Sequence, residues 1–430
     1  MSTLLGGSYG VLRHSEFVNF QTQPDPCGRQ YGSAIAAAYE LYNGRYLADA
    51  GHHFAIYNNV IRDNGHYLST ADNKAQGIKF GGVPGVPGTS YIWILNNIFY
   101  RNGQGMQHGD DCIGSIVNSQ CQADLAAWPH HFYIGFNELH DNRKVDIALK
   151  QITDLIVSQN HSYNQRDLPV GTTCAGSPTP TSLGVGRFSG NRIWAIFNTV
   201  HDTVAAFRSN GMRDTVDANG NLLPAAIYII GNLIYNVHGG TTCAPYSSTD
   251  PTRPGRPSSA GGTPTLRVGC GSSTIRSRMP TRGSASPALA TTDGERRRRH
   301  RRPMSLVPTN WGTNKFDDNF YDPSARLAQS NSVTSIISLA TMQATGQETH
   351  SLPGKAQLDA NYKPTSGSPV IDANARSAVY DTFRSLYGID IAKDIQGVPR
   401  QQGLTLDIDA YEFASSAGSS PLAPSGLVVR

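Results

Sequence analysis

Short apolar stretches with one recurring pattern run along the first 240 residues. Each copy has four to six residues of alternating apolar, β-branched or aromatic character, then an asparagine, then a second short apolar stretch. Six copies follow this pattern, at 53–65, 91–103, 131–143, 154–166, 192–204 and 226–238. The shared asparagines are Asn59, Asn97, Asn137, Asn160, Asn198 and Asn232, at intervals of 38, 40, 23, 38 and 34 residues. Residues 10–20 and 316–321 look like an earlier and a later copy, with His14 in the asparagine position of the earlier one.

This repeat predicts the fold class. One strand–turn–strand unit every 20–40 residues or so is typical of a solenoid. Asparagine suits a sharp bend because it tolerates a left-handed conformation and its amide satisfies main-chain groups. The leucine spacing of a leucine-rich horseshoe is absent, and a propeller blade needs more strands. We therefore expect an all-β, right-handed parallel β-helix in which Asn59, Asn97, Asn137 and Asn198 stack as a ladder at equivalent bends.

A second, shorter strand lies between the repeats, at 77–82, 105–110, 145–151, 185–190 and 204–210. In 145–151, the period of two places Val145, Ile147 and Leu149 inside and the residues between them outside. His108 either shares the inward position of Phe80 or turns outward at a bulge, and the direction of Arg187 is ambiguous. The side chains expected to point outward on this sheet are Lys79, Gln107, Asp146, Lys150 and Arg208.

Composition places the chain among secreted proteins without a membrane span. The 430 residues include 44 glycines and are 16% charged, and no apolar run is long enough to cross a bilayer. Cys112 and Cys121 are nine residues apart and would close a small ring, which favours an oxidising compartment.

The first residues lack the features of a signal peptide. Coil-like sequence near the start and a Ser/Pro/Gly linker at 414–430, with PLAPSGLVV resembling the opening of a fibronectin type III module, suggest a piece of a longer secreted protein.

One segment does not fit the rest of the chain. Residues 243–305 hold twelve arginines and no lysine and carry a charge of +9, whereas the whole chain is +4. A polyanion-binding arm, a disordered loop and a frameshifted stretch all remain open. On each interpretation the basic charge gives no reason to expect nucleic-acid binding by the folded body. The expected organisation is therefore coils over 1–242, an irregular insertion over 243–305, final coils and a closing segment over 306–413, and a linker over 414–430.

A family resemblance rests on two stretches. VDIALKQITDLIVSQN (145–160) resembles the coil of the pectate-lyase-like superfamily of right-handed β-helices. The succession SGSPVIDAN, DIQGVPR and DIDAYEF within 366–413 resembles the closing segment of its secreted bacterial members. The resemblance covers roughly 10–240 and 306–413. It implies a carbohydrate-active protein acting on an acidic polysaccharide, although many members of the superfamily have no known activity.

The outward row suggests a candidate site for β-elimination. A polysaccharide lyase needs a base for the proton next to a uronate carboxyl group and a cation for that carboxylate. We assign Lys150 as base, with Arg208 or Lys79 on the carboxylate. Further substrate contacts are expected from His108, Gln107 and Arg187. A Ca²⁺ site is expected at Asp110, Asp111 and Asp146.

Several alternatives stay open at this point. The lysines and arginines could be solvated surface residues, and the aspartates could cap turns. A carbohydrate-binding or adhesin solenoid without catalysis, a glycoside hydrolase and an epimerase are the competing functions. The paired histidines His52–His53 and His130–His131 tempt a metal interpretation, but His53, Tyr91, His131 and Asp154 occupy one repeat position.

Overall fold

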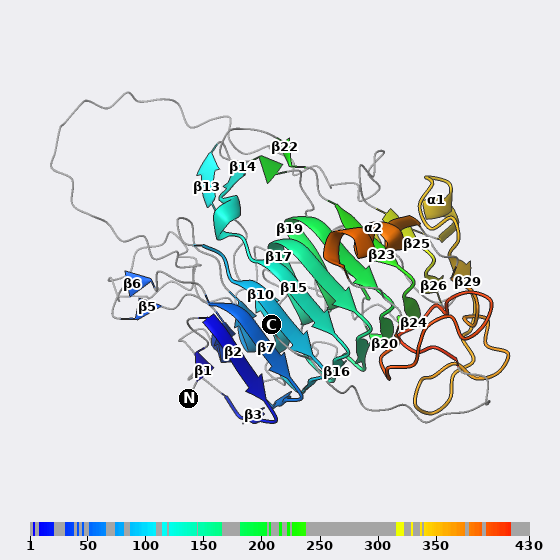
Figure 1. Ribbon diagram of the computed structural model, residues 1–430, viewed down its shortest axis with the longest axis horizontal. Helices are drawn as coiled ribbons and strands as arrows, with labels where there is room; N and C mark the ends of the chain where they lie inside the picture. Colours follow the sequence, from blue (N-terminus) through cyan, green and yellow to red (C-terminus); the bar gives the residue numbers. More distant parts are fainter. Residues whose placement is uncertain are drawn as a thin grey trace, which may run out of the picture.

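A computed structural model describes the chain in segments separated by gaps. The described residues are 3–4, 8–20, 31–37, 41–42, 45–46, 51–65, 74–80, 87–108, 114–117, 120–143, 145–165, 181–203, 206–207, 215–216, 222–223, 226–237, 315–321, 328–329, 336–337, 339–374, 378–388 and 393–413. This part of the chain is mostly parallel β-sheet with few helices (Figure 1).

Two large sheets contain most of the described strands. The twelve-stranded sheet consists of β1 (Thr3–Leu4), β2 (Ser8–Arg13), β4 (Tyr31–Ala37), β7 (His52–Tyr57), β9 (Lys74–Phe80), β10 (Ser90–Leu95), β12 (Gln104–His108), β15 (His130–Gly135), β17 (Val145–Ser158), β19 (Thr181–Ile196), β23 (Ile227–Ile230) and β25 (Lys315–Asp317). The nine-stranded sheet consists of β3 (Glu16–Val18), β8 (Val60–Arg62), β11 (Ile98–Tyr100), β16 (Glu138–His140), β18 (His161–Tyr163), β20 (Thr199–Thr203), β24 (Leu233–Val237), β26 (Phe320–Tyr321) and β29 (Leu352–Pro353).

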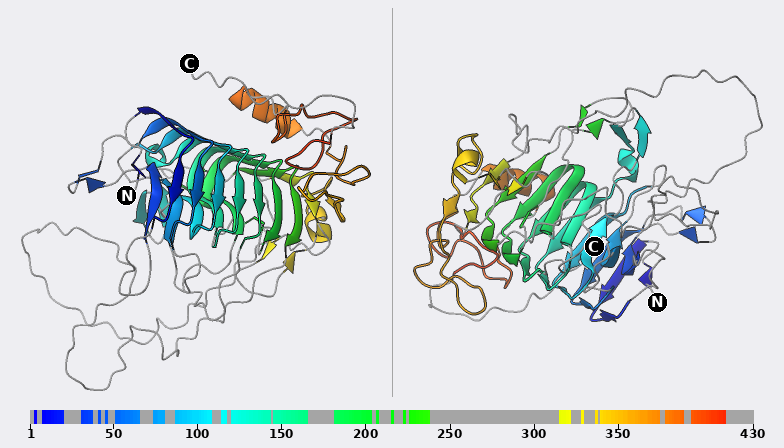
Figure 2. Two further views of the ribbon diagram at one scale, coloured as in Figure 1. Left: turned by 90° about the horizontal axis from the view of Figure 1, so that it is seen from below. Right: turned by 180° about the vertical axis from the view of Figure 1, so that it is seen from behind.

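Within both sheets, each strand pairs in parallel with the equivalent strand of the next repeat. Phe54 of β7 pairs with Ile92 of β10, which pairs in turn with Phe132 of β15. The strands of all six predicted copies pair in this way, as do those of 10–20 and 316–321, so parallel pairing of the repeats is confirmed. Figure 2 shows the strands side by side along one axis.

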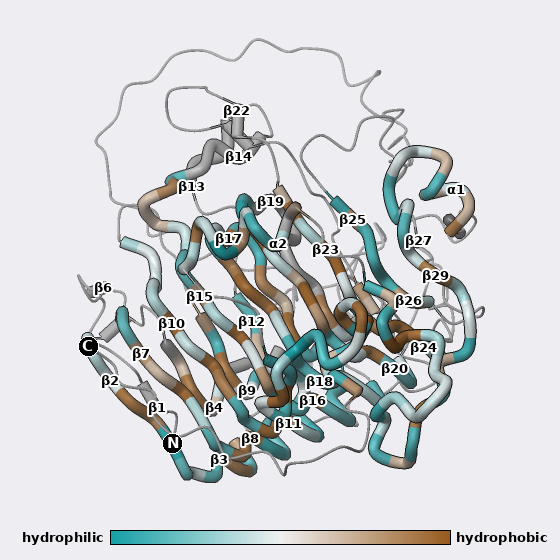
Figure 3. Tube along the Cα trace, turned by 45° about the vertical axis from the view of Figure 1, so that its right-hand side comes forward, coloured by the Kyte–Doolittle hydropathy of each residue, from teal (hydrophilic) through white to brown (hydrophobic). Residues whose placement is uncertain are grey.

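The twelve-stranded sheet folds round a corner within single strands. The first half of β17 pairs with β12, and its second half pairs with β15. Between the halves the pairing with β19 shifts register around Lys150, and Gln151 has a φ of 44°. Inward side chains from β4 to β23 of this sheet fill one long apolar core, of which Ile56, Ile94 and Ile134 form one fully buried row. In Figure 3 these strands carry much of the hydrophobic colour.

The predicted asparagine ladder is confirmed. The Oδ1 atom of Asn97 accepts the main-chain N–H and the side-chain N–H of Asn59, both at 3.0 Å. The same pair of bonds links every following step, through Asn137, Asn160, Asn198 and Asn232 to Asn319. These side chains are at most 1% exposed, so the ladder satisfies polar groups that water does not reach.

Two details of the bend differ from the expectation. The left-handed residue is not the ladder asparagine but the residue before it, with φ between 51° and 69° at His14, Asn58, Asn96, Phe136, Gln159, Phe197, Gly231 and Asp318. In the first copy the ladder position belongs to Ser15, whose main-chain N–H donates to Asn59 Oδ1 at 3.1 Å. The assignment of His14 to that position was therefore wrong by one residue.

A second, shorter row of buried amides lies five residues after the first. Asn64 donates to Asn102 Oδ1 at 2.9 Å, and Asn102 donates to Asn142 Oδ1 at 3.0 Å. The row ends at Asp146, whose carboxylate accepts from Asn142 at 2.8 Å and from the Ser162 hydroxyl at 2.6 Å. In the sequence this row corresponds to the single asparagine of DNG (63–65), RNG (101–103) and DNR (141–143), but the row was not predicted.

The C-terminal residues pack on the outside of the two sheets. Helix α2 (Ala378–Tyr387) covers the outer face of β17, β19 and β23, where Phe383 contacts Trp194 with ring centroids 5.4 Å apart (Figure 2). Val370 and Ile408 pack with Leu233 and Phe320 on the nine-stranded sheet. The segment with the predicted closing motif is thus a cover over both sheets.

Several smaller elements complete the described chain. They are the 3-10 helix at Leu125–Ala127, helix α1 (Leu339–Gln343) and the antiparallel pairs β5 (Leu41–Tyr42) with β6 (Arg45–Tyr46), β13 (Gly114–Val117) with β14 (Gln120–Ala123), β21 (Thr215–Val216) with β22 (Leu222–Leu223), and β27 (Ala328–Gln329) with β28 (Ile336–Ile337). The described part of 111–130 therefore contains a hairpin. No helix among the described residues is long and apolar enough to cross a membrane.

Three predictions fall outside the described residues. These are the irregular segment 243–305, the linker 414–430 and the ring closed by Cys112 and Cys121, whose side chains are not described.

Candidate functional site

Those residues of the predicted lyase site that the structure describes do not all lie on one exposed face. Lys150 is only 6% exposed. The pairing of β17 with β19 shifts register on both sides of Lys150, at the corner of the sheet, so the regular alternation of inward and outward side chains is interrupted there. Asp146 is fully buried, and its carboxylate accepts hydrogen bonds from Asn142 and Ser162. The expectations that Lys150 and Asp146 point outward into solvent were wrong.

His108 occupies the inward position that it shares with Phe80, so the bulge alternative is ruled out. It is fully buried, and burial lowers the pKa of its imidazole to about 3, with only partial compensation from the main chain of Lys150. A residue in this position cannot contact a polymer on the outer face, so the prediction that His108 binds substrate was wrong.

Two of the predicted residues lie on the outer face as expected. Lys79 and Gln107 are partly exposed neighbours on β9 and β12. Gln107 accepts a hydrogen bond from the side chain of Gln76 at 2.7 Å. Arg187 has a described main chain, paired with Lys150, but its side chain lies outside the described residues. Arg208, Asp110 and Asp111 lie outside the described residues altogether.

A groove lies elsewhere, between the nine-stranded sheet and the C-terminal cover. Its volume is about 690 Å³, and the sheet side contributes Glu138, His161 and Tyr163. The cover contributes Tyr362 and Tyr411 on the opposite side. Its remaining lining residues are His14, Asn58, Asn59, Val60, Asn96, Asn97, Ile98, Phe136, Ala360, Asn361, Ile395 and Gln396.

Aromatic rings form a stack on the outer side of the nine-stranded sheet, and Tyr163 of this stack lines the groove. On the nine-stranded sheet the middle residue of each short strand points inward, so that its two neighbours point outward. One outward position holds Tyr100, His140, Tyr163, His201 and Tyr235, whose successive ring centroids are 4.7–5.1 Å apart with planes within 12° of parallel. Each ring lies three residues after a ladder asparagine, a regularity that is present in the sequence but was not predicted to form a stack.

Hydrogen bonds hold the polar tips of these rings. The Tyr163 hydroxyl donates to Glu138 Oε1 at 2.6 Å. Burial and the Glu138 carboxylate both raise the pKa of Tyr163, so the phenol is protonated at neutral pH. Tyr163 therefore presents a neutral ring and a fixed hydroxyl beside one carboxylate.

Two histidines and an aspartate form a chain next to this pair. His161 and His201 face each other through Nε2 atoms 2.8 Å apart, and His201 Nδ1 lies 2.6 Å from Asp202 Oδ2. Burial lowers the pKa of His161 to about 3, and burial lowers that of His201 to about 4 against the opposing effect of Asp202. Both rings are therefore neutral at pH 7.

The hydrogen bonds then fix the tautomers. His201 donates its Nδ1–H to Asp202, so its Nε2 is an acceptor. His161 must donate its own Nε2–H to that acceptor. This leaves a lone pair on Nδ1 of His161, a residue that lines the groove.

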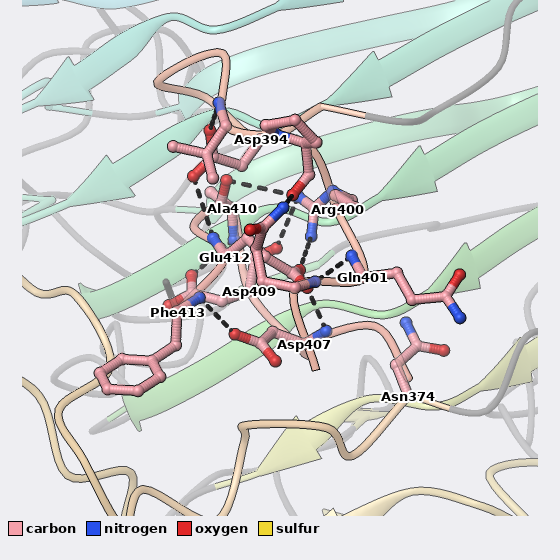
Figure 4. Close-up of polar contacts among 12 residues, drawn as sticks. Asn374, Asp394, Arg400, Gln401, Asp407, Asp409, Ala410, Glu412 and Phe413 are labelled. Atoms are coloured by element: carbon pink, nitrogen blue, oxygen red, sulfur yellow. Dashed lines mark hydrogen bonds and ion pairs between the residues drawn. The ribbon is translucent and has the colours of Figure 1, made fainter. Parts of the chain in front are cut away.

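Polar contacts anchor the cover to the sheet next to Tyr411, and Figure 4 shows those that link Arg400 with Asp409 and Ala410. The hydroxyl of Thr199 in β20 donates to the Asp409 carboxylate and accepts the Ala410 N–H at 3.1 Å. Arg400, 6% exposed, donates to the Asp409 carbonyl at 2.9 Å. The predicted motif DIDAYEF therefore carries a residue of the groove.

The other tyrosine of the cover, Tyr362, is held by a tight turn. Asp359 Oδ1 accepts the main-chain N–H of Asn361 at 2.7 Å and that of Lys363 at 3.0 Å. Tyr362 itself has a φ of 62°, and the centroid of its ring lies 4.0 Å from the centroid of the His201 ring. Neither Tyr362 nor Tyr411 was predicted, because each lies in an irregular segment without a repeat pattern.

Comparisons with other proteins leave the function to be argued from the groove itself. No protein-family model matches the sequence, and no curated protein matches it significantly.

Proposed function

We propose that the protein is a carbohydrate-active β-helix protein whose groove binds a polysaccharide. On this proposal the parallel rows wind as a right-handed solenoid, the finer form of the fold that the repeat pattern predicts. The observation that carries the function is the groove itself, with Tyr163, Tyr362 and Tyr411 beside hydrogen-bonding amides and one carboxylate. Tyrosine combines an apolar ring with a polar tip, which suits the mixed surface of a sugar.

The mixture of groups in the groove supports a sugar ligand over an apolar one. Asn96, Asn361 and Gln396 offer amide donors and acceptors, and Glu138 offers an acceptor. Because His161 is neutral and Tyr163 is protonated, the described lining carries little charge. A hydroxyl-rich chain would therefore exchange water contacts for directed hydrogen bonds and ring contacts.

Binding is tested by titrating neutral and uronate-containing oligosaccharides in a calorimeter. Tyr362→Ala and Tyr411→Ala each remove a ring from the groove, and we expect each to weaken binding about tenfold, as for a buried aromatic contact. Lys79→Ala is the matched control, because Lys79 lies on the other sheet and should leave the affinity unchanged. Equal affinity of the two tyrosine variants and the wild type would contradict the proposal.

One observation favours catalysis as a second candidate. A lyase that acts by β-elimination needs a base with an available lone pair, and the hydrogen-bond chain from Asp202 leaves one on Nδ1 of His161. His161 would take the proton next to the uronate carboxyl group, the bond from carbon to the leaving oxygen would break, and a carbon–carbon double bond would form. Tyr163 would give its proton to the leaving oxygen. The amides of Asn361 and Gln396 would hydrogen-bond the carboxylate.

A hydrolase receives less support from the groove. Glycoside hydrolysis commonly uses two carboxyl groups across the scissile bond. Among the described residues that line the groove, Glu138 is the one carboxylate. The elimination proposal is tested by incubating pectate, alginate and glycosaminoglycans and following the ultraviolet absorbance of unsaturated products. His161→Ala should abolish product while keeping affinity within about threefold, and undiminished product from this variant would rule out His161 as the base.

A further inference from the structure

The last corner of the stacked strands brings two aspartates and a histidine together, remote in sequence from the groove residues of β16 and β18. Asp317 ends β25, Asp318 follows it, and His350 precedes the next step of the ladder at Ser351. One carboxylate oxygen of each aspartate and one ring nitrogen of His350 all lie within 4.8 Å of one another. Residues 32 positions apart in sequence are thus neighbours because they belong to adjacent repeats.

The carboxylate of Asp318 is the unusual member of this group. Asp318 is 1% exposed, and its side chain makes no hydrogen bond or ion pair with any described residue; its Oδ1 atom is buried as well as unpartnered. Burying a carboxylate without a partner is unfavourable, because its charged form loses hydration and gains no compensating contact. Burial, followed by the neighbouring Asp317, raises the pKa of Asp318 to about 6.

Asp317 differs from its neighbour, because it is fully engaged. Lys315 Nζ lies 2.8 Å from Asp317 Oδ2, and the main-chain N–H of His350 donates to Oδ1 at 2.8 Å. His350 Nδ1 lies 3.0 Å from Oδ2. Although burial opposes ionisation, Lys315 and His350 keep the pKa of Asp317 at about 2. The group therefore holds one carboxylate with several partners, one buried carboxylate whose Oδ1 has no partner, and one imidazole that is 63% exposed.

We propose that Asp317, Asp318 and His350 form a binding site for a divalent first-row metal ion, with Lys315 as a competing cation. Two oxygens and one imidazole nitrogen are a common ligand set for such ions. Ligands about 2.1 Å from a common ion lie about 3–4 Å apart, so small rotations of exposed His350 close the set. The ion would supply the partner that Asp318 lacks.

Mn²⁺ is the probe, because it favours carboxylate ligands over the paired histidines elsewhere on the surface. Electron paramagnetic resonance of free Mn²⁺ during titration of the full chain gives the affinity and the number of bound ions. Asp318→Asn keeps a side chain that tolerates the φ of 53° at this position and removes the charge. We expect this variant to lose at least about tenfold in Mn²⁺ affinity, and His350→Ala to do the same.

Two further variants separate this site from general surface binding. Lys315→Gln removes the competing ammonium group and should raise Mn²⁺ affinity about threefold or more. His140→Ala is the matched control, since His140 also lies 2.7 Å from an aspartate, Asp141, and its loss should leave the titration unchanged. Identical titrations of the wild type and Asp318→Asn would overturn the proposal, and so would full affinity in His350→Ala.

Discussion

Asn142 donates its side-chain N–H to Asp146 across 2.8 Å, so a row of buried amides ends on a buried carboxylate. The longer ladder ends in the same way, because Asn319 donates to Glu348 at 3.0 Å. A row of identical amides leaves an unused donor at its last member. A carboxylate accepts that hydrogen bond and has no N–H group of its own that would need a further acceptor. Both rows end on a carboxylate.

We expect replacement of Asp146 by asparagine to stabilise the protein at alkaline pH. Burial raises the pKa of Asp146 to about 7, against the hydrogen bonds of Ser162 and Asn142. Because the pKa of Asp146 is higher in the folded protein than in the unfolded chain, the stability that the protonated carboxyl group contributes is fully present below about pH 4. That contribution to the free energy of unfolding is lost as the pH rises to about 7. The loss is on the order of 4 kcal/mol.

Urea denaturation of the wild type and Asp146→Asn at pH 5 and pH 8 measures this effect. The difference in unfolding free energy should favour the variant more strongly at pH 8, since asparagine does not ionise. Glu348 also has a pKa raised to about 7 by burial, and it is common to both proteins, so the difference isolates Asp146. The same difference at both pH values would contradict the assignment.

Removal of one rung should weaken the ladder strongly. Asn137→Ala leaves the main-chain and side-chain N–H groups of Asn97 without their acceptor, and both groups are buried. Each buried donor left unpaired costs about 1–3 kcal/mol, so we expect a loss of about 2–6 kcal/mol in unfolding free energy. Asn361→Ala, at an exposed asparagine, is the control and should cost less than about 0.5 kcal/mol. Similar losses for the two variants would mean that the ladder bonds contribute little.

His108→Leu should stabilise the protein. His108 is fully buried in the row that contains Phe80, and neither ring nitrogen makes a hydrogen bond of normal geometry. Replacing an unsatisfied polar ring by an apolar side chain of similar volume should add about 1–2 kcal/mol to the unfolding free energy at pH 7. Thermal unfolding measures the gain, and a lower melting temperature would indicate that the imidazole has a partner that matters.

The parts predicted from sequence were those with a repeat. The alternation of apolar residues and the spacing of the asparagines identified the parallel strands and the ladder. Each repeat needs the same residue types at the same positions in order to stack, so the stacking is visible as a repeat in the sequence. The direction of Lys150 was missed because a shift of register occurs inside β17, where the alternation continues unbroken in the sequence. Tyr362 and Tyr411 were missed because loops place them, and loop positions depend on contacts such as that between Thr199 and Asp409.

We expect the stack to tolerate a large deletion between β24 and β25. Asn232 and Asn319 are adjacent rungs although 87 positions separate them, and Ile229 pairs with Phe316 in normal register. The entropic cost of closing a loop grows only with the logarithm of its length. Replacing residues 241–311 by a flexible linker of about 20 residues should therefore change the unfolding free energy by no more than about 1–2 kcal/mol. Loss of cooperative unfolding in the shortened protein would show that the stack depends on the removed residues.

The step from Asn232 to Asn319 also bears on how such a protein can change over evolutionary time. Each rung bonds to the neighbouring rungs and to main-chain carbonyls of its own and the preceding repeat, as Asn97 does with Leu95 and Ile56. The length of chain between two rungs is therefore nearly free to vary. Genetic insertions at these points would add new surface without disturbing the scaffold, and duplication of one rung with its strands would lengthen the protein by a complete unit. Selection could therefore modify the exposed segments and the number of units separately.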